Sequence, residues 1–127
     1  MEVFRFMSKK EFIRLSDGET LEPYHRNHKA RTSSKGFCFM ATQDFTPEYA
    51  YNFLSCIVSE NVCVLFEVPE DYLQESSGVY ADPEGEWDDV FVAREYCCNE
   101  YSRDTFVPRQ YTCDVGMSGK WQWYEFH

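Results

Sequence analysis

Long apolar runs are missing from this sequence of 127 residues. Even the longest uninterrupted runs, such as 62–66, have the length of a strand and fall far short of the ~18 residues that a membrane-spanning helix needs. The N-terminus also lacks a charged stretch followed by an apolar core, which is the pattern of an export signal. We therefore expect a cytoplasmic protein with no membrane segment.

Basic residues are scarce: 12 Lys and Arg stand against 22 Asp and Glu, and the formal net charge is -10. A chain of this charge repels nucleic-acid phosphates, so direct binding to nucleic acid is not expected. The exception is a basic stretch within 25–35. We interpret it as a solvated loop, with an anion-binding edge as the alternative.

Standard motifs for metals, nucleotides and hydrolysis are absent, because the chain has no Cys-x-x-Cys pair, no Gly-x-Ser-x-Gly elbow and no glycine-rich phosphate loop. Three of the six cysteines, at positions 38, 56 and 63, lie in apolar runs, where a free cysteine behaves as a small buried hydrophobe. Reduced thiols are expected. Cys97, Cys98, Cys113 and His127 could in principle surround a metal ion. Neighbouring residues on a strand point to opposite faces, however, so Cys97 and Cys98 are not expected to bind the same ion, and we predict no metal site.

Aromatic residues are abundant, at 18% of the chain, and they can fill one hydrophobic core. This length is typical of a single domain, residues 1–127. Ser8 and Glu11 have capping-box spacing and Gly18 provides a stop, which predicts a helix over 9–17. Thr46 and Pro47 begin a second apolar-faced pattern, which predicts a helix over 47–58.

The remaining pattern indicates strands separated by turns. The segment 62–68 is apolar on both faces, as expected of a strand inside a sheet, and 69–87 is interpreted as an acidic loop with one helical turn near Asp71. The other predicted strands are 1–7, 36–41, 90–96, 106–113 and 121–126. We predict an α+β fold in which a twisted mixed sheet of about five to seven strands carries two helices from the N-terminal half.

Three separated elements carry the residues best suited to chemistry: Arg5 in the first strand, Thr32-Ser33-Ser34 before the second, and Glu95 in a late strand. In this order they resemble the ADP-ribosyltransferase superfamily of the type whose signature is Arg, Ser-Thr-Ser and Glu. The resemblance covers most of the chain in element order. It departs from the family pattern in the order Thr-Ser-Ser and at Ala93, where arginine- or asparagine-modifying members carry Glu or Gln.

The resemblance implies an ADP-ribosyltransferase-like fold. It also implies an NAD-dependent mono-ADP-ribosyltransferase that acts on an unknown macromolecular acceptor, which could be a protein. It implies that Arg5 holds the NAD phosphates, that Ser33, with Thr32 and Ser34, supports the nicotinamide end, and that Glu95 is the catalytic carboxylate. A guanidinium suits a diphosphate, and a carboxylate stabilises positive charge that forms on the ribose.

Alternatives remain open at each point. Glu100 competes with Glu95 for the role of the carboxylate, and Arg5 could instead pair with Glu67 or Glu95 across neighbouring strands. The chain could also be a noncatalytic interaction domain that uses the acidic loop at 69–89, or a nucleic-acid mimic. The enzyme hypothesis requires Arg5, Ser33 and a glutamate to converge on one cleft, and it fails if Arg5 and Glu95 lie on opposite faces of the sheet.

Overall fold

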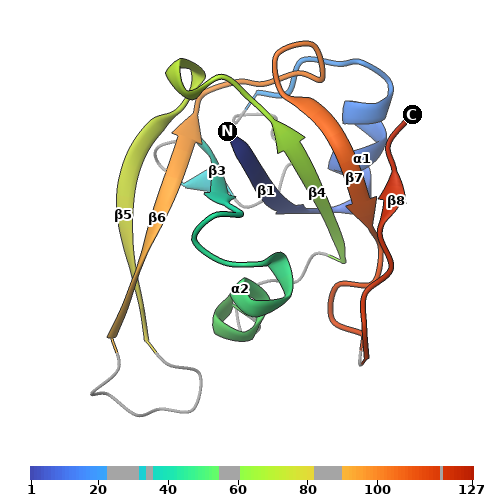
Figure 1. Cartoon of the computed structure of the whole chain (residues 1–127). Helices are drawn as coiled ribbons and strands as arrows, with labels where there is room; N and C mark the ends of the chain where they lie inside the picture. Colours follow the sequence, from blue (N-terminus) through green and yellow to red (C-terminus); the bar gives the residue numbers. More distant parts are fainter. Residues whose placement is uncertain (23–31, 34–35, 55–60, 82–89, 118) are drawn as a thin grey trace.

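The computed structural model describes residues 1–22, 32–33, 36–54, 61–81, 90–117 and 119–127. Strands in this part of the chain form one curved sheet that carries two α-helices (Figure 1). The predicted α+β class is therefore confirmed. Among the described residues no helix has the length and apolar character needed to cross a membrane.

The elements follow the chain in the order strand, helix, two strands, helix, then strands. The helical elements are α1 (Lys9–Ser16), α2 (Pro47–Leu54) and the 3-10 turn η1 (Glu70–Tyr72). The strands are β1 (Glu2–Met7), β2 (Thr32–Ser33), β3 (Gly36–Ala41), β4 (Val62–Glu67), β5 (Gln74–Ala81), β6 (Val90–Cys98), β7 (Val107–Thr112) and β8 (Tyr124–Glu125).

The strands are arranged in the order β5-β6-β3-β1-β4-β7-β8, and the short β2 pairs with β3 beside this path. All described pairings are antiparallel, so the predicted mixed sheet is wrong on this point. β3, which follows α1 in the chain and pairs with β1, runs antiparallel to β1, so the described strands contain no parallel crossover. β4 lies between β1 and β7, which confirms that the doubly apolar segment is an interior strand.

The two helices cover opposite faces of the sheet, and β1 shows this through strict alternation. Val3 and Met7 pack in the cluster that contains Leu15 of α1, and we call this side the α1 face. Phe4 and Phe6 pack in the cluster that contains Ala50 of α2, which defines the α2 face. Successive side chains of a strand point to opposite sides, so the parity of a residue determines which core it joins.

Local signals predicted the ends of α1 well, whereas 55–58 of the second predicted helix lie outside the described residues. Ser8 caps α1, since its hydroxyl accepts a hydrogen bond from the Glu11 amide at 3.1 Å. Gly18 follows the helix with a φ of 84°, the left-handed conformation that glycine adopts most easily. The predicted turn near Asp71 is confirmed as η1. The strand β5 lies where a loop was predicted; the loop was predicted because the sequence QESSGVYA lacks the apolar alternation of a strand.

Candidate functional site

Arg5 lies on the α1 face of β1 and is almost completely buried, with 2% of its surface exposed. Its Nε and Nη2 donate to the two carboxylate oxygens of Glu11 at 2.8 and 3.0 Å, which is a bidentate ion pair. Its Nη1 donates to the backbone carbonyl of Cys38 at 3.2 Å. Glu11, in the first turn of α1, is fully buried.

Aromatic residues complete the surroundings of this pair. The Tyr101 hydroxyl donates a hydrogen bond to the Glu11 carboxylate, and the Arg5 guanidinium lies 4.9 Å from the centre of the Phe37 ring and 5.8 Å from that of Phe39. Burial alone would lower the pKa of Arg5, but the adjacent Glu11 carboxylate outweighs it and the pKa is raised. Burial, followed by the Glu11 charge, raises the pKa of Tyr101 well above its ordinary value. Arg5 and Tyr101 therefore retain their protons.

These contacts give Arg5 a role in the core. Arg5 does form an ion pair, as the alternative prediction had it, but its partner is Glu11 and not Glu67 or Glu95. Glu67 instead accepts a hydrogen bond from the Met1 amino group at 2.8 Å. A diphosphate could reach the Arg5 guanidinium only by displacing a buried carboxylate and opening the core around it.

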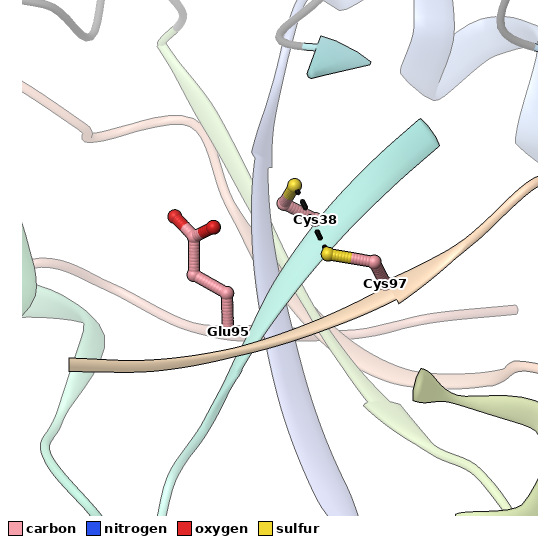
Figure 2. Close-up of side chains that lie close together, drawn as sticks. All are labelled: Cys38, Glu95 and Cys97. Atoms are coloured by element: carbon pink, nitrogen blue, oxygen red, sulfur yellow. Dashed lines mark hydrogen bonds between the residues drawn. The ribbon is translucent and has the colours of Figure 1, made fainter. Parts of the chain in front are cut away.

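Glu95 lies on β6 beside two cysteines (Figure 2). Cys38 and Cys97 are directly opposed on β3 and β6, and their sulfur atoms lie 3.4 Å apart. The two sulfurs and a carboxylate oxygen of Glu95 all lie within 4.8 Å of one another. Cys97 is buried, whereas Cys38 and Glu95 are half-buried, so the group lies at the border between core and solvent.

Arg5 and Glu95 project from opposite faces of the sheet. Arg5 stacks with Phe37 and Phe39, and Cys38 between them therefore points to the other side. Glu95 lies with Cys38 on that other side, the α2 face. The predicted convergence of Arg5 and Glu95 on one cleft is therefore wrong, although β1, β3 and β6 are neighbours in the sheet.

The other residues of the predicted site are placed less fully. Thr32 and Ser33 form β2 and pair with Phe37 and Gly36 of β3. Ser34 lies outside the described residues, as does most of the basic stretch. Glu100, the competing carboxylate, is exposed beyond the end of β6.

The pairing of Cys38 with Cys97 was not predicted from the sequence, because the two residues are 59 positions apart and only the register of β3 and β6 joins them. The prediction that Cys97 and Cys98 point to opposite faces of their strand is confirmed. Cys98 packs against the core of the α1 face, and burial raises its pKa to about 12. The one available signal was the Glu95-x-Cys97 spacing, which places both residues on one face of a strand.

A second candidate site is an open cleft of about 450 Å³. It lies where β4 ends and β7 begins, at the paired residues Glu67 and Val107; Figure 1 shows the ends of these two strands. Two exposed apolar side chains flank it, Tyr72 with 52% and Val107 with 40% of their surfaces accessible. The positive charge among the described lining residues is the Met1 amino group, which is paired with Glu67. The lining consists of Met1, Glu67, Val68, Pro69, Tyr72, Asp104, Thr105 and Val107.

No family model matches the chain, and neither a curated protein nor a solved structure is significantly similar to it. A functional assignment therefore depends on the geometry and chemistry of the sites themselves.

Proposed function

We propose that this chain is a noncatalytic binding domain that recognises a basic, partly apolar segment of another protein. The observation that carries the proposal is the cleft beside η1, which combines an apolar lining and two carboxylates in a chain with a net charge of -10. Its volume of about 450 Å³ is within the range of ligand sites and suits one or two side chains.

The apolar part of the cleft supplies the affinity. Val68 is buried beneath it, while Tyr72 and Val107 present open surface on two of its sides. A partner side chain that removes ~100 Å² of apolar surface from water gains roughly 2.5 kcal/mol. Tyr72 is well suited to such a contact, because an aromatic side chain offers a large area at a low cost in conformational entropy.

The acidic part of the cleft selects the charge of the partner. Asp104 is exposed on the rim, and the exposed Glu70 and Asp71 extend the negative charge along η1. The Met1 amino group occupies part of the Glu67 carboxylate, so Asp104 and η1 carry most of the selection. Long-range attraction of this kind accelerates association and weakens as salt is added.

NAD-dependent ADP-ribosyl transfer remains a prediction from the sequence resemblance. The adjacency of β1, β3 and β6 supports it, because these strands carry or adjoin the three motifs. The buried Arg5–Glu11 pair and the position of Glu95 on the other face count against the predicted NAD site. We therefore favour the binding domain over the enzyme.

The test is an amide NMR titration with two synthetic peptides of equal length, one with lysines flanking a central leucine and one with glutamates in their place. The lysine peptide should shift the amide resonances of Val68, Tyr72, Asp104 and Val107, and the glutamate peptide should leave them in place. The affinity for the lysine peptide should fall as salt increases.

Variants locate the contact on the protein. Tyr72→Ala should weaken binding by ~10-fold, which corresponds to the loss of ~1.4 kcal/mol of apolar contact. Tyr124→Ala is the matched control, since Tyr124 on β8 has 50% of its surface exposed and lies outside the cleft. Equal binding of the two peptides, or resonance shifts confined to other parts of the sheet, would refute the proposal.

A further inference from the structure

Three groups that commonly bind metals come together on the α2 face from two neighbouring strands. Cys38 of β3 faces Cys97 of β6 across one antiparallel register position, and Glu95 precedes Cys97 by two residues on the same side of β6. The sulfurs are 3.4 Å apart, and all three donor atoms lie within 4.8 Å of one another (Figure 2). Nothing in the binding function proposed above uses them.

The spacing of these atoms fits a tetrahedral zinc site. Two thiolates that each bind Zn²⁺ at ~2.3 Å, separated by a tetrahedral angle, lie about 3.8 Å apart. The observed separation of 3.4 Å is a few tenths of an ångström shorter, a difference that small side-chain rotations remove. We propose that Cys38, Cys97 and Glu95 form a three-ligand binding site for Zn²⁺.

The donor set selects the class of metal. Thiolates favour zinc over magnesium or calcium, which bind oxygen ligands almost exclusively. Binding forms two S–Zn bonds and one O–Zn bond, each thiol releases its proton to solvent, and no group is oxidised or reduced. The strongly negative chain favours the approach of a cation.

The position of the three residues explains how an ion would enter and stay. Cys97 is 3% exposed and anchors the inner side of the site, whereas Cys38 and Glu95 reach solvent. Strands hold ligands more rigidly than loops do, and the paired register fixes the two cysteines against each other. Three protein ligands leave the fourth tetrahedral position to a water molecule.

A disulfide is the competing use of the same two cysteines. Directly opposed residues of antiparallel strands have Cα atoms ~4.5 to 5.5 Å apart, which lies within the range that a disulfide spans. Oxidation would remove both thiolates, so the experiment uses reduced protein. The reductant is a phosphine, because a phosphine has no thiol that would compete for the zinc ion. Peptide mapping of that protein reports whether Cys38 and Cys97 are free.

The direct test is a titration of the full reduced chain with Zn²⁺ against a chromophoric chelator, together with Co²⁺ as a spectroscopic probe. We expect one ion per chain and a thiolate-to-cobalt charge-transfer band. Cys38→Ser and Cys97→Ser should each lower the affinity by ~100-fold or more, since even indirect support of a metal ligand is worth 10- to 100-fold. Glu95→Gln keeps an oxygen donor but loses its negative charge, so it should lower the affinity by a smaller factor of ~10-fold.

Two cysteines outside the site provide matched controls. Cys113→Ser replaces an exposed thiol, and Cys98→Ser replaces the neighbour of Cys97 that packs on the opposite face; both should leave the affinity unchanged. X-ray absorption of the zinc-loaded wild type should show two sulfur ligands at ~2.3 Å and oxygen ligands near 2.0 to 2.2 Å. This measurement does not depend on whether a variant folds.

Three results would overturn the proposal. The first is the absence of saturable binding to the reduced chain, and the second is full affinity in both Cys38→Ser and Cys97→Ser. The third is a Cys38–Cys97 disulfide that persists in the phosphine-treated protein.

Discussion

Replacing Glu11 by glutamine isolates the contribution of the buried ion pair to folding. The substitution keeps the size of the side chain but removes the negative charge that faces the Arg5 guanidinium. Arg5 is 2% exposed, so no solvent replaces the lost partner. Tyr101 keeps a possible acceptor in the amide oxygen, and the main change is therefore an uncompensated positive charge inside the core.

Removing one member of a buried ion pair typically costs 3–5 kcal/mol, which is a large part of the 5–15 kcal/mol that stabilises an ordinary domain. We therefore expect Glu11→Gln to lower the free energy of unfolding by about 3 to 5 kcal/mol. For a chain of 127 residues this loss corresponds to a decrease in Tm of roughly 10 to 20 °C. Urea unfolding followed by circular dichroism measures the free energy of unfolding, and a thermal melt followed by the same signal measures Tm.

The matched control uses the same chemical change at the surface. Glu19 accepts from Arg14 at 3.3 Å, and 48% of its side chain is exposed, so Glu19→Gln should cost less than about 1 kcal/mol. A double variant, Arg5→Met with Glu11→Leu, should recover much of the lost stability, because it removes both buried charges together. If Glu11→Gln costs no more than Glu19→Gln, the ion pair does not hold the core together.

Two further predictions follow from the protonation and accessibility of the same region. Burial raises the pKa of Cys98 to about 12, so its thiol stays protonated in the folded state while the unfolded chain loses that proton above pH 9. The free energy of unfolding should therefore fall as pH rises from 9 to 12, by at most about 1.4 kcal/mol per pH unit for this group. Cys98→Ala should reduce the slope of the urea midpoint against pH. Tyr101, whose pKa is also raised by burial, adds a slope of the same sign above pH 10. NAD at millimolar concentration should leave Tm unchanged, because Arg5 is closed to a diphosphate. A saturable rise in Tm, together with a release of nicotinamide that Glu95→Gln abolishes, would restore the ADP-ribosyltransferase hypothesis.

The sequence allowed the prediction of elements whose signals are local. Ser8 and Gly18 mark the ends of α1 through capping, and the doubly apolar 62–68 segment identifies an interior strand. Even here a local signal had two possible meanings. Glu11 matched the capping box, and its amide does bond to Ser8, but its carboxylate turns inward to Arg5, six positions away across the turn from strand to helix.

The edge hairpin shows where local signals end. β5 pairs with β6 over the register from Gln74 and Cys97 to Ala81 and Val90. Its sequence is polar and contains Gly78, so neither apolar alternation nor β-propensity marks it as a strand. Pairing with a neighbour supplies the hydrogen bonds that hold it, and that neighbour is known only once the sheet is assembled.

The candidate sites depend on register in a stricter way, because a shift of one residue moves every side chain of a strand to the other face. The observed register places Cys97 opposite Cys38 and Glu95 on the same side, away from Arg5. A register shifted by one position would place Cys98 opposite Cys38 and would move Glu95 to the face of Arg5. The contrast between Cys97→Ser and Cys98→Ser therefore tests two conclusions at once. Loss of zinc binding in Cys97→Ser alone would support the metal site and the separation of Arg5 from Glu95, whereas loss in Cys98→Ser alone would reverse both.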